Sequence, residues 1–116
     1  MKVDLYESVT VVFTGTANLT TAQCEIRNDI YGTLWEVKSV QISTDSPQTY
    51  GASQFYLYLN SQTPGGIRDS TYQGDGANSD TDITMRAGDR LIGVWTGGDS
   101  GSHATLTIRG EKETGR

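Results

Sequence analysis

Cysteine and histidine are scarce in this sequence, and each shortage argues against a class of protein. Among 116 residues there are one cysteine, Cys24, one histidine, His103, and two prolines. A single cysteine cannot form an internal disulfide, so Cys24 is expected to be a small buried apolar residue and folding is expected in a reducing compartment. One histidine cannot supply the imidazoles of a cupin-type metal site. No cofactor is therefore expected.

Clustered positive charge and long apolar runs are also missing. The 9 Lys and Arg are scattered along the chain against 14 Asp and Glu, which gives a net charge of −5 and a pI near 4.6. Nucleic-acid binding depends on a clustered basic surface, so no nucleic acid is expected as a partner. No run of 18 apolar residues and no charged-then-apolar leader occurs. We therefore expect neither a membrane partner nor a signal-directed export route.

The sequence is rich in glycine, threonine and serine, between short segments of β-branched and aromatic residues. Its 14 glycines indicate many turns, and a hydrophobic content of 34% indicates a thin core. The β-type segments recur about every 10 to 15 positions, and none has the period of a helix. This pattern predicts one all-β domain over residues 1–116, an antiparallel β-sandwich of about eight strands. A jelly-roll-like topology is expected, with an immunoglobulin-like sandwich as the alternative.

The expected strands follow from alternation and turn residues. They cover residues 8–14 (or from Val3), 21–26, 34–44, 54–60, 67–72, 82–86, 90–96 and 103–109. Residues 63–66 predict a type II turn, residues 74–79 a longer loop and residues 87–89 a tight turn. The last third is interpreted as a meander of neighbouring strands.

Three patterns within these strands make local predictions. Trp35 and Val37 share one face, but the apolar positions then shift to Val40 and Ile42, which predicts a β-bulge near Lys38. Residues 90–96 are apolar on both faces, as in a central strand, and Trp95 is expected to be buried. Residues 1–14 are expected to be an edge strand or docking arm, and residues 111–116 a polar tail.

Tyrosine is the most informative residue type for binding. The 54–60 segment places Tyr56 and Tyr58 on the face opposite Phe55 and Leu57. Tyrosines stack on sugars and are enriched at protein interfaces. The candidates for a glycan or subunit surface are Tyr31, Tyr50, Tyr56, Tyr58 and Tyr72. Ordinary packing on a sheet face is the alternative for each of them.

Acidic residues in one glycine-containing loop form a weak calcium candidate. Asp75, Asn78, Asp80 and Asp82 are hard oxygen ligands of the kind that Ca²⁺ prefers. Their spacing differs from that of an EF-hand loop, and no bidentate Glu closes the set. The preferred interpretation is a solvated loop with local turn hydrogen bonds.

The segment Gly98-Asp99-Ser100-Gly101 looks like the nucleophile segment of trypsin-like serine proteases. That chemistry needs a histidine that is oriented by a carboxylate and accepts the serine proton. His103 lies only three residues after Ser100, at the expected start of a strand. A flexible hairpin loop with His103 at the solvent edge is the preferred interpretation, so no catalytic residues are assigned and no enzyme is expected.

Several strand and turn segments resemble a family of small structural proteins of tailed bacteriophages, found mainly in phages of actinobacteria. These segments are 34–37 (LWEV), 69–74 (DSTYQG), 78–80 (NSD), 87–89 (AGD), 94–97 (VWTG) and 104–108 (ATLTI). The resemblance covers about residues 33–110 and implies a jelly-roll-like virion component. It carries no catalytic residue.

Two functions are therefore expected, in this order. The first is a structural subunit of a tailed bacteriophage virion, in capsid decoration or in the tail or its tip. Such a subunit would assemble in the host cytoplasm with other virion proteins and with copies of itself, for example as a trimer. The second is a β-sandwich module that binds a carbohydrate or a host surface. A calcium-stabilised or hydrolytic enzyme ranks last.

Overall fold

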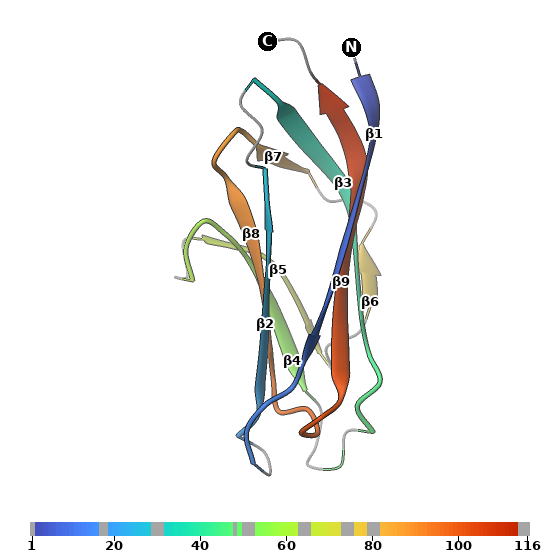
Figure 1. Cartoon of the computed structure of the whole chain (residues 1–116), viewed down its shortest axis with the longest axis vertical. Coiled ribbons are helices and arrows are strands. Elements are labelled where there is room, and N and C mark those ends of the chain that lie inside the picture. Colours follow the sequence, from blue (N-terminus) through green and yellow to red (C-terminus); the bar gives the residue numbers. More distant parts are fainter. Residues whose placement is uncertain are drawn as a thin grey trace.

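The computed structural model describes residues 2–16, 19–28, 32–47, 49, 53–62, 66–72, 76–78 and 82–113. For residues 67–72 and 76–78 it describes the backbone alone. The described residues form nine strands in two facing sheets (Figure 1). The chain measures 48 × 22 × 22 Å along its principal axes. The strands are β1 (Lys2–Val12), β2 (Thr21–Arg27), β3 (Leu34–Thr44), β4 (Gln54–Leu59), β5 (Ile67–Tyr72), β6 (Gly76–Asn78), β7 (Ile83–Met85), β8 (Arg90–Thr96) and β9 (His103–Glu113).

The chain pairs from its ends inward. β1 pairs with β9, β2 with β8, β3 with both β6 and β7, and β4 with β5, all antiparallel. The two halves of the chain thus form one long ribbon that folds back at β4 and β5. Successive pairs lie alternately in a first sheet, ordered β1-β9-β3-β6 with β7 beside β3, and a second sheet, ordered β2-β8-β4-β5. This winding is a jelly roll.

The expected all-β sandwich is confirmed, and the topology decides against the immunoglobulin-like alternative. In an immunoglobulin-like sandwich the first two strands are neighbours in one sheet. Here β1 and β2 lie in different sheets. The interpretation of the last third as a meander is wrong for the same reason: β7, β8 and β9 pair with strands from the first half of the chain and not with one another.

Two further boundaries differ from the sequence prediction. Gly76–Asn78, expected to lie in a loop, forms β6 against Val40–Ile42 of β3. Gly, Ala and Asn have low β propensity, so the pairing comes from the exposed ladder of β3 and not from local preference. β9 continues to Glu113, beyond the expected start of the polar tail, because β1 and β3 pair with it on both sides. The expected turn at residues 63–66 lies largely outside the described residues.

Both sheets contribute buried side chains to one core. The predicted bulge is confirmed, since the β3–β9 register shifts between Val37 and Ser39. It keeps Trp35, Val37, Val40 and Ile42 all buried. Trp95 of β8 is 0% exposed, and its ring centroid lies 4.6 Å from that of Phe55 on the neighbouring strand β4.

Cys24 lies inside this core, as expected. A Cβ added to Gly93 of β8 would lie 2.9 Å from its Sγ atom, so the thiol fits against a residue without a side chain. Burial raises the pKa of the Cys24 thiol to about 12. The thiolate is therefore scarce at neutral pH and the residue is chemically inert in the native state.

The outer face of the first sheet is polar. Ser8 of β1 lies opposite Thr107 of β9, with 3.1 Å between their hydroxyl oxygens, and Thr10 lies 2.9 Å from Thr105 in the same way. Such hydroxyl pairs satisfy each other and leave the face hydrophilic. Within the described ranges there is no helix long and apolar enough to cross a membrane.

Candidate functional site on the outer face of the second sheet

Tyr56 and Tyr58 project from β4 onto the outer face of the second sheet. Their neighbours Phe55 and Leu57 point inward and are fully buried, because side chains alternate along a strand. The β4–β8 register places Tyr56 opposite Val94 and Tyr58 opposite Ile92. We call the patch formed by Tyr56, Tyr58, Ile92 and Val94 the tyrosine face.

The two rings of the tyrosine face are held close together. Their centroids are 6.3 Å apart and their planes are tilted by 35°. The Tyr56 hydroxyl donates a hydrogen bond to Oε1 of Gln54, at 3.2 Å, one position along the same face. Both tyrosines are partly buried, so they lie on the sheet and do not extend freely into solvent.

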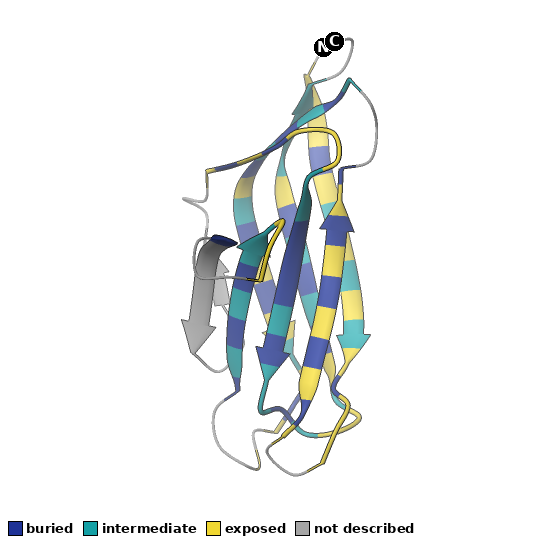
Figure 2. Cartoon of the chain, turned by 90° about the vertical axis from the view of Figure 1, so that its left-hand side faces the viewer, coloured by how far each residue is buried: buried dark blue, intermediate teal, exposed yellow. Residues whose placement is uncertain are grey.

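Ile92 shows how well this outer face is covered. It points away from the core, opposite Tyr58 on one side and Glu25 on the other, yet it is only 3% exposed. No residue of β8 or β4 is classed as exposed, whereas exposed and buried residues alternate along β2 (Figure 2). The centre of the face is therefore apolar and aromatic.

Charged residues border the tyrosine face on the β2 side. Glu25 forms ion pairs with Arg27, at 2.9 Å, and with Arg90, at 3.1 Å. All three side chains are between 36% and 51% exposed, so these pairs contribute little to stability. They place hydrogen-bonding groups beside the apolar centre.

Among the five tyrosines singled out in the sequence, the structure brings together Tyr56 and Tyr58. Tyr31 and Tyr50 lie outside the described residues. The backbone of Tyr72, in β5, lies opposite Gln54. For Tyr72 the structure describes the backbone and not the side chain.

Two of the four calcium candidates lie in the described part of the chain. Asn78 ends β6, which pairs with β3, and Asp82 is exposed just before β7. Asp75 and Asp80 lie outside the described residues. In the described part of the chain no three His, Cys, Asp or Glu side chains gather as metal ligands would. The solvated loop stays the prediction, with calcium binding as its weaker alternative.

The protease-like segment 98–101 ties the two sheets together. It connects β8 of the second sheet to β9 of the first, so it is not the hairpin loop that the sequence suggested. Oδ1 of Asp99 accepts hydrogen bonds from the Ser46 hydroxyl, at 2.8 Å, and from the Thr49 amide, at 3.0 Å. The Asp99 amide in turn donates a hydrogen bond to Oγ of Ser46. The Thr20 hydroxyl also donates to the carbonyl of Gly98. Through Asp99 the segment is hydrogen-bonded to the loop after β3.

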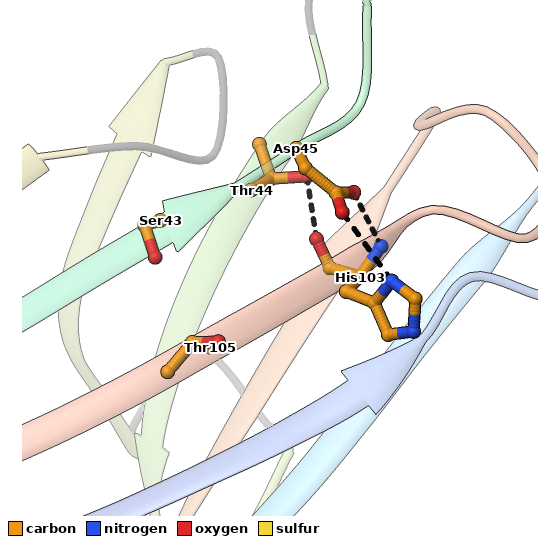
Figure 3. Close-up of a pocket in the computed structure, with 5 residues that line it drawn as sticks. All are labelled: Ser43, Thr44, Asp45, His103 and Thr105. Atoms are coloured by element: carbon orange, nitrogen blue, oxygen red, sulfur yellow. Dashed lines mark hydrogen bonds and ion pairs between the residues drawn. The ribbon is translucent and has the colours of Figure 1, made fainter.

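His103 begins β9 at the solvent edge, as expected, but its partner was not foreseen. Oδ2 of Asp45 lies 3.3 Å from Nδ1 of His103, and Oδ1 accepts the His103 amide at 2.6 Å. The carbonyl of His103 accepts a hydrogen bond from Thr44. These residues, with Ser43 and Thr105, line an open pocket of about 210 Å³ (Figure 3). In Figure 3 the imidazole points away from Ser43 and Thr105, and the Thr44 hydroxyl bonds to the His103 carbonyl and not to the ring.

Asp45 gives this end of the molecule a pH dependence. The amide of His103 holds the pKa of the Asp45 carboxyl below its usual range, and the imidazole adds a second hydrogen bond and charge attraction. The stabilisation is present above the unfolded-state pKa of about 3.9 and is lost as the pH falls through the lower folded-state pKa.

We therefore expect Asp45→Asn to lower the free energy of unfolding at pH 7 and to lower it less at pH 2. Urea unfolding of both proteins across that range measures the difference. Asn keeps an oxygen that can accept the His103 amide, so the substitution isolates the charge. A difference that is the same at pH 7 and pH 2 would contradict the assignment to the carboxylate.

Comparison with known proteins gives structural likenesses alone. No family model matches the chain, and no curated protein matches its sequence. PirA is similar at 18% identity, with 89% of this chain and 92% of PirA covered and a TM-score of 0.43. A carbohydrate-binding module CBM36, solved with calcium and xylotriose, is similar at 15% identity, 92% and 98% coverage and a TM-score of 0.39.

The third structure is a larger enzyme, the GH26-CBM35 β-(1,4)-mannanase of Podospora anserina. Its identity is 14% and its TM-score is 0.40. The match covers 92% of this chain but 27% of the mannanase chain. At these TM-scores the three likenesses carry no argument about function, and the jelly-roll assignment rests on the strand order of the chain itself.

Proposed function

We propose that this protein is a non-catalytic binding module whose tyrosine face binds a carbohydrate. The observation that supports the proposal is the Tyr56–Tyr58 pair, two partly buried rings 6.3 Å apart beside a hydrogen-bonded amide. Sugar rings have apolar C–H faces that stack on aromatic rings and hydroxyl edges that need hydrogen-bond partners. The tyrosine face offers the first at its centre, while Gln54 and Glu25 offer the second at its border.

The rigidity of the site favours binding despite its small area. Tyr56 and Tyr58 stand on a strand that is paired on both sides, by β5 and by β8, so little backbone freedom is lost when a ligand binds. An aromatic contact contributes about 0.5–1.5 kcal/mol beyond the area that it buries. Two such contacts suit a dissociation constant in the micromolar to millimolar range.

A glycan array followed by calorimetry tests the proposal. We expect Tyr56→Ala and Tyr58→Ala each to weaken binding at least about tenfold, the equivalent of one stacked ring at about 1.4 kcal/mol. Leu19→Ala is the control, because Leu19 is a large exposed apolar residue, 76% accessible, that lies outside the tyrosine face and outside β1. Addition of a chelator tests separately whether calcium contributes.

Two results would count against a glycan site here. The first is the absence of any binding on a broad array of plant, bacterial and animal glycans. The second is binding that is unchanged by both tyrosine substitutions while the variants keep the wild-type unfolding temperature.

A structural subunit of a tailed bacteriophage virion is the second candidate function. It is favoured by the resemblance of residues 33–110 to phage structural proteins and by the apolar side chains exposed on β1, namely Val3, Tyr6 and Val12. Such a subunit would reside in the virion and contact other virion proteins and copies of itself. Mass spectrometry of purified particles tests this candidate, and absence of the protein from those particles would contradict it.

A further inference from the structure

Among the described strands, β1 is an open sheet edge along its whole length. It pairs with β9 over all of its 11 residues without a register shift and contains no proline. Long edge strands are normally shortened, bulged or interrupted, because an unpaired row of amides and carbonyls pairs with other chains. Here the edge is long and its pairing with β9 is regular.

Hydrogen bonds at the end of β1 show which backbone groups face outward. The amide of Phe13 donates to Ser102 at 2.8 Å, and its carbonyl accepts from Gly101 at 3.0 Å, both on the β9 side. Thr14, the next residue, bonds to Thr21 on the opposite side through both groups, at 2.9 Å. Because this direction alternates along a strand, the even-numbered residues 2–12 direct their amides and carbonyls to the open edge.

These even-numbered positions are exposed, and the edge is also apolar. Among the residues that the structure describes, none bonds to this edge between Lys2 and Val12. Four large hydrophobic residues are classed as exposed in the same ranges, and three of them, Val3, Tyr6 and Val12, lie on β1 at 42%, 57% and 44%. A partner strand would satisfy the backbone groups and cover apolar surface at once.

We infer that two copies of the chain pair through β1, antiparallel, about a two-fold axis at Glu7. In this register the open amides and carbonyls of both strands meet, and every residue of β1 has a partner. Val3 lies opposite Val11 of the second copy, and Leu5 lies opposite Val9. Apolar residues on the core side of the sheet thus meet one another across the interface.

Neighbouring registers fit less well. A two-fold axis at Tyr6 leaves Val11 and Val12 unpaired and places Glu7 opposite Leu5. An axis at Ser8 leaves Lys2 and Val3 unpaired and places Glu7 opposite Val9. Each of these registers keeps one kind of apolar pair, Val3 with Val9 or Leu5 with Val11, whereas the Glu7 axis provides two.

The charges near Glu7 are balanced in the inferred dimer. Two Glu7 carboxylates meet at the axis, where like charges repel. Each Glu7 also lies 3.9 Å from Nζ of Lys112, an ion pair in which the lysine is 25% exposed. Two lysines therefore accompany two carboxylates.

This contact does not depend on glycan binding. The tyrosine face is on the second sheet and β1 is an edge of the first, so the two proposals fail or succeed separately. The inferred dimer gives the virion-subunit candidate a specific self-contact, and it can be tested in the purified protein without any particle.

Analytical ultracentrifugation of the full chain is the first test. We expect a species of twice the 12.6 kDa chain mass that dissociates on dilution. Ser8→Pro removes an amide hydrogen that β9 does not use, and we expect it to reduce dimerisation at least tenfold. Ser8→Ala, which keeps that hydrogen, is the matched control and should dimerise like the wild type. A wild-type chain that stays monomeric at about millimolar concentration, or a dimer that Ser8→Pro leaves intact, would overturn the inference.

Amide exchange and cross-linking keep the test valid if Ser8→Pro does not fold. In the wild type, the amides of Tyr6, Ser8 and Thr10 should become protected as concentration rises, while those of the odd-numbered residues are protected throughout. Glu7→Cys should form an intermolecular disulfide on mild oxidation, because facing residues in a non-hydrogen-bonded pair are about 4.5 Å apart. Val9→Cys should not, since Val9 faces Leu5, and Cys24 is buried and inert. Concentration-independent exchange, or cross-linking at position 9 and not at position 7, would overturn the register.

Discussion

Trp95→Ala is expected to lower the free energy of unfolding by about 3–5 kcal/mol, which would leave much of this small domain unfolded. Trp95 is fully buried and packs against Phe55 of β4, and Ala22 of β2 lies opposite it on the other side. Two strands of one sheet thus depend on a single large side chain, and a thin core has little other material to fill the cavity. Urea or thermal unfolding followed by circular dichroism measures the loss.

Tyr6→Ala is the control for this prediction. Tyr6 is also aromatic and lies on a strand, but it is 57% exposed and contacts Arg109 through its ring face, at 5.0 Å. Its removal from the isolated monomer should cost less than about 0.5 kcal/mol. Fluorescence from Trp95 typical of full water exposure, measured with Trp35 replaced by Phe, would show that the core assignment is wrong.

Gly110→Ala is expected to destabilise the fold by about 3 kcal/mol or more, at the upper end of what overpacking usually costs. A Cβ at this position would lie 1.9 Å from the carbonyl oxygen of Glu36 and 3.0 Å from the amide nitrogen of Lys38. Both are backbone atoms of β3 at its bulge, so no side-chain rotation relieves the clash. Either β9 separates from β3 or the bulge is rearranged, and thermal unfolding measures the resulting loss.

Gly88→Ala separates this steric effect from backbone strain. Gly88 has φ = 94° in the turn before β8, and a Cβ there would meet nothing within 4 Å. Its cost is therefore conformational alone, about 1–2 kcal/mol. Equal effects of the two substitutions would show that the close approach of β9 to β3 is not what requires glycine at position 110.

The two proposed surfaces would reinforce each other. A two-fold dimer through β1 carries two tyrosine faces, and a polysaccharide or a glycan-coated surface offers repeated ligands. Linked binding of two weak sites raises the apparent affinity far above that of either one. We therefore expect Ser8→Pro to reduce binding to immobilised polysaccharide more than binding to a short soluble oligosaccharide.

Local features of the fold were predictable from the sequence because they depend on near neighbours. Alternation of apolar residues marks which face of a strand is buried, and the shift between Val37 and Val40 marks the bulge. The turn at residues 87–89 follows from its glycine and from Asp89, whose amide donates to the carbonyl of Arg86 at 2.9 Å. A strand apolar on both faces indicated the central place of β8 and the burial of Trp95.

The choice of partners was decided only by the tertiary structure. Alternation says which way a side chain points but not which strand lies beside it, so nothing local specifies that Lys2 pairs with Glu113. β6 was missed because Gly76–Asn78 has little β propensity of its own. The Asp99–Ser46 hydrogen bond and the Asp45–His103 pair were missed because each joins residues more than fifty positions apart. The sequence by itself determined the strands other than β6 and the alternation that marks their buried faces. The pairings, and with them the tyrosine face and the open edge of β1, arise only when two layers close over one shared core, because that burial is a property of the whole chain.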